Sequence, residues 1–391
     1  MIRVLPIAAI AAILALGLFP GLLGPTSYAP APYCSPTASF QPTFALADSQ
    51  IVFLAESLST NDAERIGRLE VELDALRHRL AIPGFSAAIV KNQRVIWVRG
   101  FGCADIASGT PATPHTPYHL ASLTKPFGAT ILLALVEEGL VNLDDPISDY
   151  GISLDSPGTI RVKHLLSHTS EGMPGSRYRY HGDRFGLIDR VMESATGKRF
   201  RELLIEKILL PLDMQDTLPA PVGIEVEVYQ RGQADPRFQD AWNRLAKPYW
   251  LVRGYGNVDH AYATYFGSAA GLISSVMDYA RFDAAIDQHT FISEETQKMA
   301  WTPFVANNGR PLPYGYGWFI QERKGLQYIW HYGYWDCSST LIVKVPERGL
   351  TFLIFANSDR LSSPFGLGAG KNVRRSPAAR VFLDVFVESG R

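Results

Sequence analysis

The sequence is short of cysteine and has almost no excess of charge, and these shortages exclude several classes of protein. Its three cysteines, Cys34, Cys103 and Cys337, are too few for a disulfide-stapled scaffold. One bridge stays open in an oxidising compartment, although we expect Cys103 and Cys337 to be buried as small apolar side chains. The 37 basic and 38 acidic residues give a formal net charge of −1, so we expect no nucleic-acid partner.

Several enzyme motifs are also missing. No G-x-S-x-G occurs, which disfavours a nucleophile-elbow hydrolase. His164 and His168 are spaced as metal ligands on a helix would be, but neither has the glutamate of H-E-x-x-H beside it. The glycine-rich stretch 366–371 lacks the spacing and the final Ser or Thr of a phosphate-binding loop. We therefore expect neither a metal nor a cofactor.

The longest apolar run lies at the N-terminus. Residues 4–23 are almost purely apolar and follow Arg3, a pattern typical of an export signal or an uncleaved membrane anchor. A buried core helix is the alternative, but the run has no polar face. Residues 1–23 are thus interpreted as signal or anchor, and the Pro-, Ser- and Ala-rich stretch 24–60 as a linker. We expect an exported protein that is periplasmic, secreted or tethered to a membrane through residues 4–23.

The remaining chain shows strand patterns at both ends and helical patterns in the middle. Expected strands lie at 85–90, 94–101, 314–320, 326–330, 340–345 and 350–356. Expected helices lie at 61–80, 126–138, 162–166, 184–195, 200–209 and 377–387. The aromatic-rich stretch 211–265 has few regular periods and is interpreted as a long surface excursion.

This order of elements predicts an α+β fold. The simplest assembly is one antiparallel sheet that draws strands from both chain ends, flanked by terminal helices, with a helical region inserted between them. We expect one domain over residues 61–391. Its sheet parts would span about 61–115 and 300–391, and its helical part about 116–299.

Ser122 and Lys125 form an S-x-x-K pair at the start of an expected helix. This spacing puts both side chains on one face of the helix, and the helix N-terminus favours negative charge near the serine. A partly desolvated lysine there can lose its proton and accept one from the hydroxyl. A serine cap followed by a surface lysine is the structural alternative, because S-x-x-K is common by chance.

The residues around this pair decide between the two interpretations. Residues 121–126 resemble the serine β-lactamase and penicillin-binding-protein superfamily, most closely the class C β-lactamase-like branch, which includes DD-peptidases, D-aminopeptidases and esterases. Matching stretches follow in order across about residues 82–358, among them HLLSHTS at 164–170, GLIS at 271–274 and YGYGW at 314–318. The resemblance implies that Ser122 is the nucleophile and Lys125 its proton acceptor.

The second motif of that branch is Y-x-N, five residues before an anchor on a helix. Tyr180 stands five residues before Phe185, so the resemblance makes it the phenolate-like base or proton shuttle. Gly182 occupies the asparagine position and removes an amide that would contact lysine and substrate. Glu171 is inserted where the HTS stretch normally reaches its glycine directly. The change at position 182 puts penicillin recognition in doubt, and the insertion of Glu171 is expected to reshape the loop before Tyr180.

The third motif, K-T-G or H-x-G, matches His331-Tyr332-Gly333. The resemblance places His331 and Gly333, together with Gly182, in the substrate-binding site. Gly333 would let the substrate backbone approach the strand. The backbone N–H groups of Ser122 and Tyr334 would form the oxyanion hole. Because histidine is mostly neutral near pH 7, His331 weakens the anchoring of a substrate carboxylate.

The sequence as a whole predicts a serine hydrolase of the β-lactamase-related type that acts through an acyl-enzyme. The expected substrate is a small ester, a D-amino-acid amide or a cell-wall peptide. Two alternatives stay open at this point. One is a catalytically weak binding or regulatory protein that retains the fold, and the other is a β-lactamase.

Overall fold

The computed structural model describes residues 59–252, 256–262, 264–370 and 372–388. The apolar run at 4–23 and nearly all of the linker lie outside these residues. Among the residues described, no helix is both long and apolar enough to cross a bilayer.

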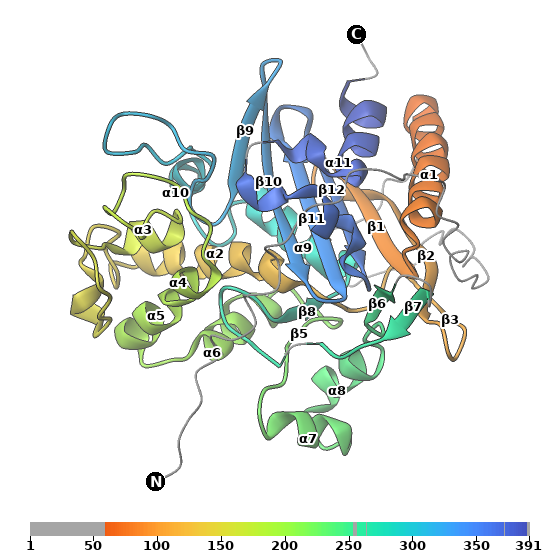
Figure 1. The fold of residues 1–391 in the computed structure, drawn as a ribbon, viewed down its shortest axis with the longest axis horizontal. Helices are drawn as coiled ribbons and strands as arrows, with labels where there is room; N and C mark the ends of the chain where they lie inside the picture. The colour runs from red at the N-terminus through yellow and green to blue at the C-terminus, as the bar shows by residue number, and fades with distance from the viewer. Residues whose placement is uncertain (1–58, 253–255, 263, 371, 389–391) are drawn as a thin grey trace, which may run out of the picture.

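A seven-stranded antiparallel sheet forms the centre of the molecule (Figure 1). Its strand order, β3-β2-β1-β12-β11-β10-β9, joins the two ends of the chain at the β1–β12 pair. The strands are β1 (Gly84–Lys91), β2 (Arg94–Asp105), β3 (Thr110–Pro111), β9 (Phe319–Arg323), β10 (Leu326–Trp335), β11 (Ser338–Val345) and β12 (Leu350–Ala356). The predicted α+β fold with a sheet from both chain ends is confirmed.

Both faces of this sheet are buried. Along β1, Phe85 and Ile89 face one hydrophobic core, whereas Ala88 and Val90 face another, as the two-residue period of a strand requires. The first core lies under α1 (Thr60–Leu80) and α11 (Pro377–Phe382), and the second lies under the helical middle of the chain. The helical region therefore packs on one face of the sheet, and α1 and α11 pack on the other.

The helical middle matches the prediction in outline and differs in detail. Its helices are α2 (Lys125–Glu137), α3 (Val162–Leu166), α4 (Gly182–Gly186), α5 (Ile188–Thr196), α6 (Phe200–Leu204), α9 (Val276–Asp287) and α10 (Glu294–Ala300). The single helix expected at 184–195 is two helices, α4 and α5, that meet at Leu187.

The strand expected at 314–320 begins only at Phe319. The preceding residues form a loop that approaches the helical region closely. A Cβ on Gly315 would lie 2.2 Å from the Ala300 carbonyl oxygen, and one on Gly317 would lie 2.3 Å from the Ala129 Cβ. The two glycines therefore serve tight packing between the sheet and helices α2 and α10.

The 211–265 excursion carries more structure than its sequence indicated. It contains β5 (Leu218–Pro219), α7 (Glu225–Gln230), α8 (Pro236–Asn243), β6 (Tyr249–Val252) and β7 (Gly256–Asp259). Strand β5 joins β4 (Tyr118–His119) and β8 (Leu272–Ser274) in a small sheet of order β4-β8-β5.

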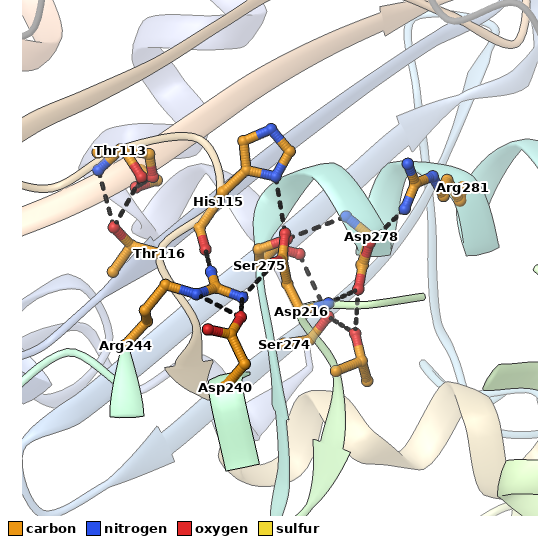
Figure 2. A network of polar contacts seen from close by, with 12 residues as sticks. Thr113, His115, Thr116, Asp216, Asp240, Arg244, Ser274, Ser275, Asp278 and Arg281 are labelled. Carbon is orange, nitrogen blue, oxygen red and sulfur yellow. Dashed lines mark hydrogen bonds and ion pairs between the residues drawn. The ribbon is translucent and has the colours of Figure 1, made fainter. Parts of the chain in front are cut away.

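A buried polar network anchors this excursion to the body (Figure 2). The Asp216 carboxylate contacts Arg244 at 2.8 Å and His115 at 2.8 Å, and it accepts a hydrogen bond from the Ser275 hydroxyl at 3.0 Å. The Asp216 backbone N–H in turn donates to the Asp278 carboxylate on α9. The start and end of the excursion's helical part are thereby tied to one point on the body.

The cysteines depart from the prediction in one respect. Cys103, on β2, is disulfide-bonded rather than a free apolar side chain. Cys337 is a free, buried thiol, as expected.

Candidate active site

Side chains of β11 anchor the segment that carries Ser122 through hydrogen bonds. Ser122 lies in a 3-10 turn, Ala121–Thr124, that runs directly into α2. The Thr340 hydroxyl donates to the Leu120 carbonyl at 2.8 Å, and the Ser338 hydroxyl donates to the His119 carbonyl. Ala121 adopts a left-handed φ of 49°, a conformation that a non-glycine residue seldom adopts. The backbone before Ser122 is thus fixed by tertiary contacts.

Gly333 lies on β10 against this same segment. A Cβ at position 333 would lie 2.0 Å from the Leu120 carbonyl oxygen and 2.2 Å from the Thr340 hydroxyl. Glycine is therefore required for β10 to lie against the serine-bearing turn. This packing explains why position 333 is glycine, which the sequence did not indicate. Contact of Gly333 with substrate stays a prediction.

Lys125 is fully buried one turn after Ser122. Its Nζ donates to the Ser122 Oγ at 3.1 Å and to the Ala269 carbonyl oxygen at 2.8 Å. Aromatic rings of Tyr180 and Phe185 lie 4.9 and 5.3 Å from the ammonium nitrogen. Burial lowers the pKa of Lys125 to about 7, and the charge of Asp183 opposes this effect. A substantial fraction of the lysine is therefore neutral at pH 7 and able to accept a proton.

Tyr180 reaches the same point from the loop before α4. Its ring packs on His168 at 4.3 Å and lies parallel to Phe319 at 6.1 Å, centroid to centroid. Burial raises the pKa of the phenol well above its ordinary value, Tyr332 adds to this effect, and the nearby Ser122 hydroxyl opposes it. The phenol is consequently neutral, which favours a proton shuttle over a phenolate base. The phenol oxygen has no hydrogen-bond partner among the described residues.

The His331 ring is fully buried on β10 and both of its nitrogens are occupied. Nδ1 lies 2.8 Å from the Tyr332 carbonyl oxygen, which can only accept, so Nδ1 carries the proton. Nε2 then accepts from the Tyr314 hydroxyl at 2.9 Å. Burial and the neighbouring Lys125 lower the pKa of His331 well below its ordinary value, so the ring is neutral. Its role as a substrate contact stays a prediction.

Two further predicted residues lie at the edges of this cluster. Gly182 is the first residue of α4, and a Cβ built there meets nothing within 4 Å. Tyr334 lies near the end of β10 with its side chain 43% exposed. The oxyanion hole made of the Ser122 and Tyr334 N–H groups stays a prediction.

Glu171 contacts the two residues that flank Tyr180, which the sequence did not indicate. Its carboxylate lies 2.8 Å from the Arg179 Nε and 3.3 Å from the His181 Nε2, the residues on either side of Tyr180. The sequence signalled Glu171 only as an insertion in the HTS stretch. It gave no indication of these partners, because they depend on how the loop folds back.

The paired histidines 164 and 168 have structural roles. The His164 Nδ1 accepts from the Arg161 N–H at 3.1 Å, and the His168 Nδ1 accepts from the His181 N–H at 3.2 Å. Within the described ranges, no group of three or more His, Cys, Asp or Glu side chains is arranged to hold a metal ion.

The sheet built from both chain ends, with a serine and a buried lysine in contact at the start of α2, defines the serine β-lactamase and penicillin-binding-protein class of fold. Comparison with known proteins agrees. The Beta-lactamase family model matches residues 73–369, and the chain belongs to that family.

Relatives and solved structures support the same assignment. The chain is 24% identical to penicillin-binding protein 4* of Bacillus subtilis over 68% of its own length and 66% of the relative's. It is 25% identical to a D-aminopeptidase of Gluconobacter oxydans over 64% and 51%. The chain thus spans about half to two thirds of the length of these relatives.

Two solved structures share the fold. The octameric penicillin-binding protein homologue from Pyrococcus abyssi superposes with a TM-score of 0.68 at 24% identity, covering 81% of this chain and 77% of that one. The D-amino acid amidase from Ochrobactrum anthropi SV3 has a TM-score of 0.65 at 20% identity, covering 83% and 99%.

Proposed function

We propose that this protein is a serine acyl hydrolase that cleaves small amides or peptides, with D-amino-acid amides as the leading substrate class. The observation that carries the proposal is the contact of the buried Lys125 with the Ser122 hydroxyl at 3.1 Å. The pKa of about 7 at Lys125 matches the working range of a general base near neutral pH. Relatives named D-aminopeptidase and D-amino acid amidase support the substrate class.

The reaction would proceed in two halves. Neutral Lys125 takes the hydroxyl proton as the Ser122 Oγ attacks the carbonyl carbon, and the N–H groups of Ser122 and Tyr334 hold the developing oxyanion. The proton passes to the leaving amine through Tyr180, and the C–N bond breaks to leave an acyl-enzyme. Water then attacks the ester carbonyl, one of its protons passes through the same groups to the Ser122 Oγ as the ester C–O bond breaks, and the acid departs.

The charges around the site favour a substrate without a free carboxylate close to the scissile bond. His331 is neutral and its nitrogens are occupied, and position 182 has no amide. Asp183 adds negative charge near Lys125. A penicillin carboxylate would therefore find weak anchoring here, which places β-lactamase activity second.

We also propose that residues 61–391 form the hydrolase domain and that it works outside the cytoplasm, led or tethered by residues 4–23. Arg3 and the apolar run after it are typical of an export signal. The disulfide at Cys103 fits an oxidising compartment. Recovery of the protein in the cytoplasmic fraction alone would contradict this proposal.

The test of the reaction is Ser122→Ala, assayed with D- and L-alanine p-nitroanilide, p-nitrophenyl butyrate and nitrocefin. We expect turnover to fall by about 10³-fold or more, because the nucleophile is lost, while the melting temperature stays unchanged. Ser148→Ala, at an exposed serine, is the matched control. Equal rates for Ser122→Ala and the parent would contradict the assignment of Ser122 as the nucleophile. Inactivity of the parent on all substrates would favour a binding protein, and faster turnover of nitrocefin than of the anilides would favour a β-lactamase.

A further inference from the structure

Glu171 joins the two residues that flank Tyr180. Its side chain is only 14% exposed, and each carboxylate oxygen has a different partner. Oε2 lies 2.8 Å from the Arg179 Nε, and Oε1 lies 3.3 Å from the His181 Nε2. One carboxylate therefore spans the positions immediately before and after the tyrosine.

The proton positions on His181 agree with this arrangement. The His181 Nδ1 caps α4 by accepting from the Arg184 N–H at 3.3 Å. Since Nδ1 accepts, the proton of the neutral ring lies on Nε2, the atom that faces Glu171. The imidazole thus links the Glu171 carboxylate to the first turn of α4.

The backbone on both sides of Tyr180 is fixed as well. The Arg179 N–H donates to the His168 carbonyl oxygen at 2.8 Å, and the His181 N–H donates to the His168 Nδ1 at 3.2 Å. The Tyr180 phenol oxygen makes no hydrogen bond of good geometry with a described residue, and the nearby Ser122 hydroxyl is the polar group that influences its pKa. The position of its ring is therefore set by packing and by its two neighbours.

We propose that Glu171 is a positioning residue that holds Tyr180 in register with Ser122 and Lys125 through Arg179 and His181. The inference rests on the proposed function, since it assumes that Tyr180 moves a proton in the reaction. The inserted Glu171 and the missing asparagine at position 182 are both departures from the family pattern, and position 182 is the first residue of α4, two residues after Tyr180. A displacement of about 1 Å at a catalytic group can cost on the order of 10²-fold in rate.

The experiment is a double-mutant cycle of Glu171→Ala with Tyr180→Phe, followed on the best amide substrate. We expect Tyr180→Phe to lower kcat by about 10²–10⁴-fold. Glu171→Ala should lower kcat by about 10- to 100-fold with little change in KM. In the Tyr180→Phe background, Glu171→Ala should have almost no further effect, because the group that it positions is already disabled.

Controls separate positioning from a general effect on folding. Glu227→Ala breaks a similar but exposed pair with Arg231 on α7 and should leave kcat unchanged, and Tyr178→Phe should be nearly silent. Glu171→Gln keeps the size of the side chain and one acceptor oxygen, so it should retain part of the activity even if the alanine variant folds poorly.

Unchanged kcat in both Glu171 variants, or effects of Glu171→Ala and Tyr180→Phe that simply multiply, would overturn the positioning role. Normal kcat in Tyr180→Phe, alongside an inactive Ser122→Ala, would instead contradict the assignment of Tyr180. Full activity in Ser122→Ala would contradict the proposed function itself.

Discussion

Two lysines among the described residues are fully buried, and their surroundings are opposite. Lys344, on β11, contacts the carboxylates of Asp283 and Asp287 on α9 at 2.5 and 2.9 Å. Lys125, at the start of α2, donates to a hydroxyl and a carbonyl and makes no ion pair with a described residue. Burial acts to lower the pKa of both lysines. At Lys344 the carboxylates outweigh burial and raise the pKa, whereas at Lys125 the pKa falls to about 7.

The difference shows that burial alone does not make a lysine a base. A buried ammonium with carboxylate partners keeps its proton and joins two elements, here the sheet and α9. A buried lysine whose partners are neutral gives up its proton near neutral pH and can work as a general base. Lys344 therefore serves as a structural reference within the same protein for Lys125, the proposed general base.

The largest predicted effects come from replacing each lysine by methionine. Lys125→Met should lower turnover by about 10²–10⁴-fold, the usual range for a lost acid–base group, with little loss of stability because no buried carboxylate is left unpaired. Lys344→Met should retain most turnover but lose about 3–5 kcal/mol of unfolding free energy, because Asp283 keeps a buried charge without its partner.

Urea denaturation and steady-state kinetics on both variants test this contrast. The Lys344→Met/Asp283→Asn double variant should recover part of the lost stability, since it removes both charges of the pair. Large stability losses in Lys125→Met together with normal turnover would show that both lysines are structural.

The pH dependence of activity gives the second test of the comparison. Below a pKa of about 7, Lys125 is protonated and cannot accept the Ser122 proton, so kcat/KM should fall about tenfold per pH unit on the acid side. Above that pKa, kcat/KM should level off. Lys344 keeps its proton throughout this range and should not contribute. The measurement is kcat/KM for an uncharged substrate from about pH 5 to 9, and a kcat/KM that still rises tenfold per pH unit up to pH 9 would show that Lys125 is not desolvated in solution.

The smallest predicted effect comes from introducing a side-chain amide at position 182. Gly182→Asn restores the amide of the family motif, and the open space at position 182 should accommodate it with little change in stability. We expect nitrocefin to acylate Ser122 about tenfold faster, the equivalent of one hydrogen bond of about 1.4 kcal/mol. Gly182→Ala is the matched control, because it adds a Cβ without an amide. Equal acylation rates for the two variants would show that the amide does not reach the substrate.

The fold could be predicted from the sequence where a periodic pattern recorded burial. The apolar spacing from Ile66 to Leu76 predicted a helix at 61–80, and the structure has α1 at Thr60–Leu80. The strand expected at 350–356 is β12 with the same bounds. Such patterns can be read from the sequence because the polarity of each residue depends mainly on whether its face of the helix or strand is buried.

The site could be predicted only in part. The contact between Ser122 and Lys125 follows from three-residue spacing at a helix start. The support from Thr340 and the close approach of Gly333 to Leu120 join residues more than 200 positions apart. No local pattern encodes those contacts, so the sequence suggested candidate reacting residues but not what holds them in place.

The polar network at Asp216 has a consequence for how this protein can change. Arg244 and Asp216 tie the two ends of the excursion's helical part to one point, and the Ala246 N–H adds a hydrogen bond to the Pro117 carbonyl oxygen at 3.0 Å. Replacements of α7 and α8 that keep these clamps, and the apolar cluster of Tyr229 and Ala241 with Ile273 on β8, should therefore leave in place β4, which leads into the Ser122 turn.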